Sequence, residues 1–145
     1  MQYVVSRPYY IPDDPDALAS ALFFNLWGRR CWPYKALEIG DVLYWYYTPA
    51  KTIVWRSRTT DVDRFEYRDK ESVAMTLMAR FGSFDRQDPY FLDATNSGFC
   101  LAYKVQPLER LAREKPRYLR FPQLGWLKLE SAPALQWVGH VSPVS

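Results

Sequence analysis

Aromatic and basic side chains occur together in this chain, in a pattern that could hold a nucleic-acid base. A flat ring can stack on a base, and a guanidinium or ammonium group beside it can bind a phosphate. Core packing is the alternative for each tryptophan, and a solvated helix end is the alternative for the two adjacent arginines. The candidate pocket walls are Trp27, Trp32, Trp45, Trp55 and Trp126. The candidate phosphate contacts are Arg29, Arg30, Lys35, Arg56 and Arg58.

Lys35 and Glu38 offer a different chemistry. The lysine could stabilise negative charge that develops on a phosphate, and the carboxylate could take a proton. A pair of histidines acting as acid and base is excluded, because His140 is the only histidine of the sequence. Lys35 and Glu38 therefore offer an enzyme alternative to binding, a metal-independent reaction at a phosphate.

The sequence predicts neither a metal nor a cofactor. Two cysteines, Cys31 and Cys100, and one histidine are too few for a zinc site. The sequence also lacks a P-loop, a dinucleotide-binding fingerprint, a nucleophile elbow and paired metal-binding carboxylates. Chemistry that depends on such groups is excluded, and binding becomes the main prediction.

The length and composition predict one globular domain over residues 1–145, with 48% hydrophobic and 24% charged residues. Lys and Arg number 19 against 16 Asp and Glu, so the net charge of +3 allows phosphate contacts without a polybasic surface. No apolar run approaches the roughly 18 residues of a membrane span, and the first residues do not form a secretory leader. We expect a cytoplasmic protein with reduced cysteines and no membrane contact.

Alternation of side chains predicts a mostly antiparallel sheet. The clearest signal is a hairpin in which strand 42–47 returns through a turn at 48–51 into strand 52–58. Further strands are expected at residues 2–9, 99–105, 119–121, 126–129 and 136–141.

Helix signals occur at three places between these strands. Pro15 after Asp14 begins a helix that is expected to end at Gly28, and a second helix is expected at 69–81, before Gly82. A short third helix is expected at 107–114, and residues 83–98 are expected to form a long loop. The order of elements predicts an α+β fold, a small antiparallel pseudo-barrel with two longer helices and one short helix.

The Gly40-Asp41 turn that opens strand 42–46, and the return through residues 53–55 toward Val62, resemble the PUA-like superfamily, in particular its EVE and ASCH branch. Residues 103–111 resemble the strand of that family that leads into a proline-started helix. The resemblance implies a PUA-like pseudo-barrel that binds DNA or RNA and, as in EVE-like members, holds a modified base in an aromatic pocket. The ASCH signature Gly-x-Lys-x-x-Glu-x-Arg is matched at Lys35 and Glu38, which implies ribonuclease activity as the alternative.

A third hypothesis is a protein-interaction or regulatory module, in which exposed aromatic side chains form a patch for a partner. The partner of such a domain could be a nuclease or an ATPase encoded elsewhere. Concentration-dependent association without affinity for nucleic acid would favour this hypothesis over a nucleic-acid reader.

The binding hypothesis predicts that the purified protein leaves labelled single-stranded RNA intact over hours, with or without divalent cations. The physical reason is that any cleavage would have to be carried by Lys, Glu, Tyr or Arg alone. Cleavage that disappears in both Lys35→Ala and Glu38→Gln, with folding unchanged, would contradict this prediction and establish the ribonuclease alternative.

Overall fold

The computed structural model describes residues 1–139. Strands and short helices alternate along the chain, and α2 is the one helix of more than six residues in that range. The elements are β1 (Gln2–Arg7), α1 (Pro15–Ser20), β2 (Phe23–Trp27), β3 (Val42–Tyr47), the 3-10 helix η1 (Thr48–Ala50), β4 (Thr52–Tyr67), α2 (Lys70–Phe81), α3 (Pro89–Asp93), β5 (Gly98–Glu114), β6 (Trp126–Lys128) and α4 (Ala132–Trp137).

The strands are hydrogen-bonded in the order β2-β5-β4-β3-β1-β6. β1 runs parallel to β3, whereas β1 with β6, β2 with β5, and β3 with β4 are antiparallel pairs. The β3–β4 hairpin pairs Tyr44 with Arg56 and Trp45 with Trp55, and its register shifts between Trp45 and Tyr46. The predicted hairpin is confirmed at residues 42–47 and 52–58.

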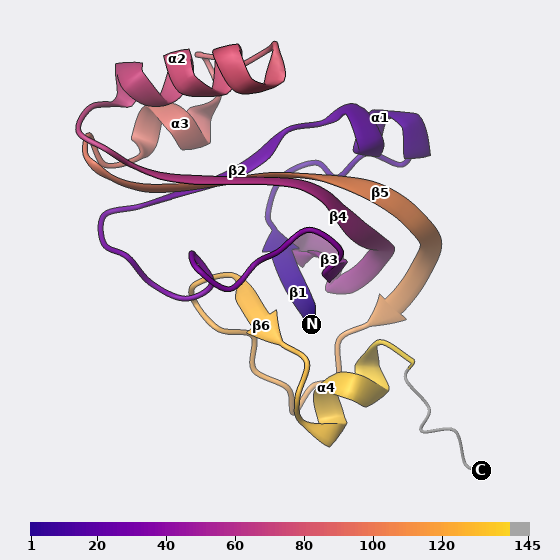
Figure 1. The fold of residues 1–145 in the computed structure, drawn as a ribbon. Coiled ribbons are helices and arrows are strands. Elements are labelled where there is room, and N and C mark those ends of the chain that lie inside the picture. The colour runs from indigo at the N-terminus through magenta and orange to yellow at the C-terminus, as the bar shows by residue number, and fades with distance from the viewer. Residues whose placement is uncertain (140–145) are drawn as a thin grey trace. The chain divides into compact units, whose positions relative to one another are not determined.

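The chain forms two compact units, which are described separately. Of the described residues, the first unit contains 1–19, 40–59 and 105–139, and the second contains 20–39 and 60–104. In the second unit α2 and α3 lie together on one side of the strands (Figure 1). The core between them includes Phe24, Leu26, Leu77, Phe91 and Cys100. The core of the first unit includes Val4, Tyr44, Tyr46, Ile53 and Trp137.

The second predicted helix is confirmed as α2, and its ends follow local chemistry. The Asp69 side chain caps the helix by accepting a hydrogen bond from the Ser72 N–H at 2.8 Å. Gly82 ends it with a φ of 85° and donates its N–H to the Met78 carbonyl at 2.8 Å. Between these ends Val73 and Leu77 face the core.

The helix expected to run from Pro15 to Gly28 is wrong in its second half. α1 ends at Ser20, and Phe23–Trp27 is the strand β2, paired with β5. This stretch is apolar almost all round, and such a run suits a strand buried on both faces as well as a helix. Gly98 permits the close pairing, because a Cβ there would lie 2.0 Å from the Trp27 carbonyl oxygen.

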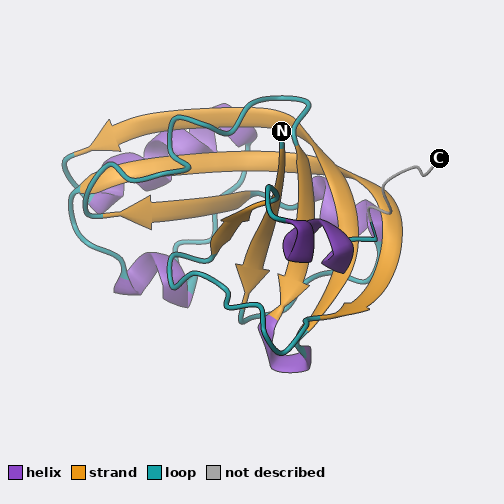
Figure 2. Ribbon diagram, turned by 90° about the horizontal axis from the view of Figure 1, so that it is seen from below, coloured by secondary structure: helices purple, strands orange, loops and turns teal. Residues whose placement is uncertain are grey.

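The short helix expected at 107–114 is also wrong. β5 continues as a strand from Gly98 to Glu114, one of the long orange ribbons of Figure 2. Hydrogen bonding to the neighbouring β4 decides the conformation against the local helix-start signal of Pro107. A cross-strand ion pair between Arg56 and Glu109, at 3.3 Å, accompanies this pairing.

Three smaller corrections concern the loops and the C-terminal part of the chain. The long loop at 83–98 contains α3, whose first turn Asp88 caps by accepting from the Tyr90 N–H. Residues 119–121 form no strand. The strand expected at 136–141 is wrong at 136–137, which belong to α4, and its end lies outside the described residues. The strand expected at 126–129 is confirmed as β6.

Buried polar contacts in the first unit generate a stability prediction for Ser57→Ala. The Ser57 hydroxyl accepts the Trp45 Nε1–H at 2.8 Å and donates to the Leu43 carbonyl at 3.0 Å, and both side chains are buried. Its removal deprives a buried indole of this acceptor, so the free energy of unfolding should fall by about 1–3 kcal/mol. Urea unfolding measures the change. Ser97→Ala, in an exposed turn, is the control, and an equal effect of the two substitutions would contradict the assignment.

Candidate functional site

The connection that follows β2 has a backbone held in place by an arginine of β4. Residues 28–38, named here the 28–38 connection, contain tight turns in which the Tyr34 N–H donates to the Cys31 carbonyl at 2.9 Å. The Arg64 Nε donates to the Tyr34 carbonyl at 2.8 Å, and another nitrogen of the same guanidinium donates to the Leu37 carbonyl. The Tyr34 ring packs edge-on against Phe99 with centroids 5.3 Å apart. The connection is thus anchored from inside the second unit.

Cations and one large aromatic ring on this connection face solvent. Trp32 exposes 40% of its surface, and Arg29, Arg30 and Lys35 are exposed as well. Glu38 is the one acidic residue of the connection, so its formal charge is three minus one, or +2. An exposed ring among cations can stack on a base while the cations contact phosphates.

Cys31 lies within this basic environment. Burial raises the pKa of its thiol, and the Arg29 guanidinium partly offsets this by favouring the thiolate. Cys100, in contrast, is fully buried, and both burial and the Asp63 carboxylate raise the pKa of its thiol. Both cysteines are free thiols.

The other predicted tryptophans are less accessible. Trp27, at the end of β2, is half-buried in the second unit. Trp45 and Trp126 belong to the first unit and expose 0% and 1% of their surfaces, and Trp126 packs edge-on against Tyr3. Trp55 donates its Nε1–H to the Pro12 carbonyl at 2.8 Å. Trp27 and Trp32 therefore lie in the second unit. The other three tryptophans, Trp45, Trp55 and Trp126, lie in the first unit and are buried.

Trp55 is covered by an arginine. The Arg110 guanidinium carbon lies 5.2 Å from the Trp55 ring centroid, and Arg110 is held there by an ion pair with Asp13 at 2.6 Å. The Arg110 guanidinium thus lies over the Trp55 ring in a cation–π contact. In the described structure Trp55 is thus a packing residue with its polar atom satisfied.

The hairpin of the first unit contains a tyrosine that sequence reasoning missed. Tyr44 is buried and donates its hydroxyl to the Gln2 Oε1 at 3.3 Å. Burial raises the pKa of its phenol; Arg56 and Arg113 lower it, and Glu109 raises it. The phenol therefore stays protonated at neutral pH and acts as a hydrogen-bond donor. The sequence feature that could have indicated this tyrosine is its position opposite Arg56 in the β3–β4 hairpin.

Of the remaining predicted phosphate contacts, Arg58 is exposed, and Arg56 is paired with Glu109. Lys35 and Glu38, the residues of the ribonuclease alternative, are both exposed on the 28–38 connection. Among the described residues no group of three or more His, Cys, Asp or Glu could hold a metal ion. None of the helices in residues 1–139 has the length and apolar character to span a bilayer.

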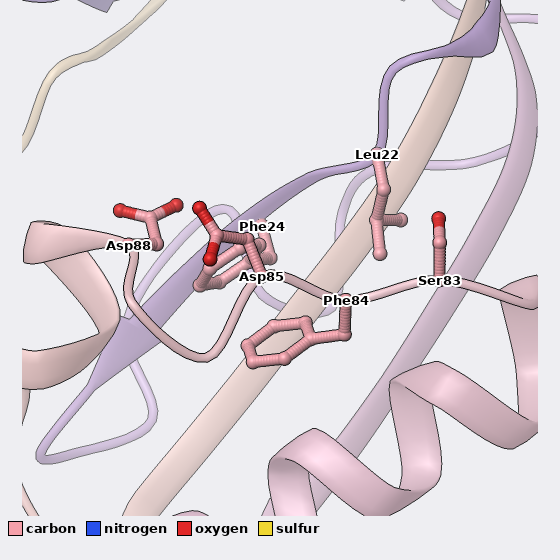
Figure 3. Close-up of a pocket in the computed structure, with 6 residues that line it drawn as sticks. All are labelled: Leu22, Phe24, Ser83, Phe84, Asp85 and Asp88. Atoms are coloured by element: carbon pink, nitrogen blue, oxygen red, sulfur yellow. The ribbon is translucent and has the colours of Figure 1, made fainter.

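A cavity of about 420 Å³ lies in the second unit beside α3. Figure 3 shows the carboxylates of Asp85 and Asp88 near one another and the rings of Phe24 and Phe84 below them. The Asp85 carboxylate accepts the Gln87 N–H before α3, and the Asp88 carboxylate accepts the Tyr90 N–H in the first turn of α3, each at 2.9 Å. Two negative charges repel phosphate, so this cavity does not suit a nucleic-acid backbone. Its lining is completed by Leu22 and Ser83.

Comparison with known proteins shows which fold this is. No protein-family model and no curated protein matched the sequence. Among solved structures, the ASCH protein of Zymomonas mobilis superimposes with a TM-score of 0.57 and 14% identity, covering 96% of this chain and 94% of that one. Two single-residue variants of the same protein superimpose with the same TM-score at 17% and 18% identity, over 96% and 95% of this chain and 97% and 94% of theirs.

The chain therefore shares its fold with this ASCH protein. This confirms the resemblance that the Gly40-Asp41 hairpin indicated, and it confirms the α+β fold class. At this level of identity the likeness defines the fold and leaves the activity to be argued from the residues of this chain.

The anchoring of the 28–38 connection predicts its response to Arg64→Met. This substitution keeps the apolar stem but removes both hydrogen bonds to backbone carbonyls, so the connection should open more often. Hydrogen exchange of a peptide covering residues 31–38 should become faster, by about tenfold. Arg68→Met, at an exposed arginine just past β4, is the control and should leave this exchange unchanged. Unchanged exchange in Arg64→Met would show that the connection is held by other contacts.

Proposed function

We propose that this chain is a nucleic-acid-binding protein that contacts a single-stranded segment through the 28–38 connection. The observation that carries the proposal is the exposure of Trp32 beside Arg29, Arg30 and Lys35. One base stacks on the indole, and the three cations contact the phosphates on either side of it. The PUA-like fold supports the proposal, since the resemblance implies binding of DNA or RNA.

A single strand suits this surface better than a duplex. A base must leave its stack before an exposed ring can contact its face, and this costs least in a loop or a single strand. Trp27, which is half-buried, comes just before the connection and is the candidate for a second stacking contact. A modified base, as EVE-like members hold, would be distinguished by its contacts with these rings.

Stacking is the part of the proposal that a single substitution can test. Trp32→Ala should weaken binding of a fluorescent single-stranded 12-mer about tenfold to a hundredfold, because stacking contributes ~1–3 kcal/mol per base. Fluorescence anisotropy against modified and unmodified RNA and DNA measures the dissociation constants, and circular dichroism checks the fold. Ile39→Ala removes exposed apolar surface immediately after the connection and should leave binding unchanged.

The charge component has its own readout in the same assay. If all three cations contact phosphates, replacing Arg29, Arg30 and Lys35 by Gln should reduce the salt slope of log K by about 2. Trp32→Ala binding that equals wild type would contradict stacking at this site. Absence of binding to every oligonucleotide, together with concentration-dependent self-association, would favour the protein-interaction module.

A further inference from the structure

A second aromatic and basic surface lies in the first unit, on the segment between β5 and β6. The beginning of this segment is fixed by Lys115, whose N–H donates to the Lys51 carbonyl at 2.8 Å. The Lys115 ammonium group donates to the carbonyls of Pro116 at 3.0 Å and Leu119 at 2.6 Å. These bonds close a turn, in which the Leu119 N–H also donates to the Pro116 carbonyl at 3.2 Å. Lys115 therefore stabilises the loop and does not point its charge at solvent.

Further along the segment, Phe121 is held by aromatic packing. Phe121 stacks on Tyr46 with centroids 5.1 Å apart and an interplanar angle of 23°. It also packs edge-on against Trp137 at 6.2 Å. Leu119 packs against the same buried cluster. The segment is thus anchored on both sides of Tyr118 within the first unit.

Three side chains between these anchors remain in solvent. Arg117, Tyr118 and Arg120 are exposed, and Tyr118 exposes 68% of its surface. Leu119 and Phe121 are half-buried in the core, so their neighbours are left outside. The Tyr118 ring therefore buries little surface in the first unit, and Arg117 and Arg120 lie within two residues of it in the sequence.

The charges around Tyr118 are unbalanced. Residues 113–120 contain four basic side chains and one acidic side chain, a formal charge of +3. Two other arginines of this unit are neutralised, since Arg110 pairs with Asp13 and Arg56 with Glu109. Within residues 1–139, no carboxylate forms an ion pair with Arg117 or Arg120.

We propose that Tyr118, with Arg117 and Arg120, is a second stacking site for single-stranded nucleic acid. The inference rests on the proposed function and assigns a contact separate from Trp32. A base stacks on the phenol ring, and the two guanidinium groups contact the neighbouring phosphates. Because the segment is anchored on both sides of Tyr118, little backbone freedom is lost when the strand binds.

The test compares two exposed tyrosines of the first unit. Tyr118→Ala should weaken binding of oligo(U) and oligo(dT) 12-mers about tenfold, and Tyr118→Phe should restore it, because the ring is kept. Tyr10→Ala is the matched control: Tyr10 is 71% exposed but is followed by Asp13, Asp14 and Asp16, which repel phosphates. Anisotropy titrations measure all three variants. A Tyr118→Ala protein that binds like wild type, or an equal loss in Tyr10→Ala, overturns the inference.

The phosphate contacts and the location of the base are tested independently. The double variant Arg117→Gln with Arg120→Gln should lower the salt slope of log K by about 1.4. Photocrosslinking with 4-thiouridine or 4-thiothymidine strands should label the tryptic peptide that contains Tyr118, and a label confined to other peptides contradicts the site. If Trp32→Ala loses affinity and Tyr118→Ala does not, the proposed function stands and this inference fails. If wild type binds neither strand, both fail.

Discussion

Buried indole rings impose the main constraint on the first unit, because each carries an N–H that must find an acceptor away from water. Trp45 uses the Ser57 hydroxyl, Trp55 the Pro12 carbonyl, and Trp137 the Arg113 carbonyl at 3.0 Å. These acceptors come from the hairpin, the N-terminal segment and the end of β5. The first bond lies within the hairpin, the second ties the hairpin to the N-terminal segment, and the third ties α4 to the end of β5. The Arg110–Asp13 pair covers Trp55 and reinforces one of these connections.

The constraint on the second unit is different: the 28–38 connection, which is rich in turns, must keep a defined backbone conformation at the surface. Arg64 donates hydrogen bonds to two backbone carbonyls of the 28–38 connection. Leu37, a residue of the same connection, is fully buried. The exposed cations are then displayed from a fixed backbone. The acidic cavity beside α3, with Asp85 and Asp88, belongs to the same unit. One unit thus carries both an exposed connection with a formal charge of +2 and a cavity lined by two carboxylates.

The two surfaces assigned to nucleic acid share one construction. Trp32 and Tyr118 are both exposed rings, each flanked in sequence by arginine or lysine, and each stands on a loop whose backbone is anchored by a buried or half-buried cation. Arg64 serves the first loop, and Lys115 serves the second. In both cases one cation donates hydrogen bonds to backbone carbonyls, while the other cations face solvent. The residue that positions each loop is therefore distinct from the residues proposed to contact phosphates.

Local signals in the sequence were sufficient for the β3–β4 hairpin and for α2, where alternation or caps agree with the final pairing. The residue types of the candidate site, aromatic rings beside arginines, could also be predicted from composition and spacing. Tertiary structure alone decided that residues 23–27 and 107–114 are strands, because hydrogen bonding to neighbouring strands outweighs local helix signals. It also decided which tryptophans are accessible. Trp45 and Trp32 are the same residue type, but one lies on a strand facing a core and the other on a turn outside it, and sequence spacing carries no information on that difference.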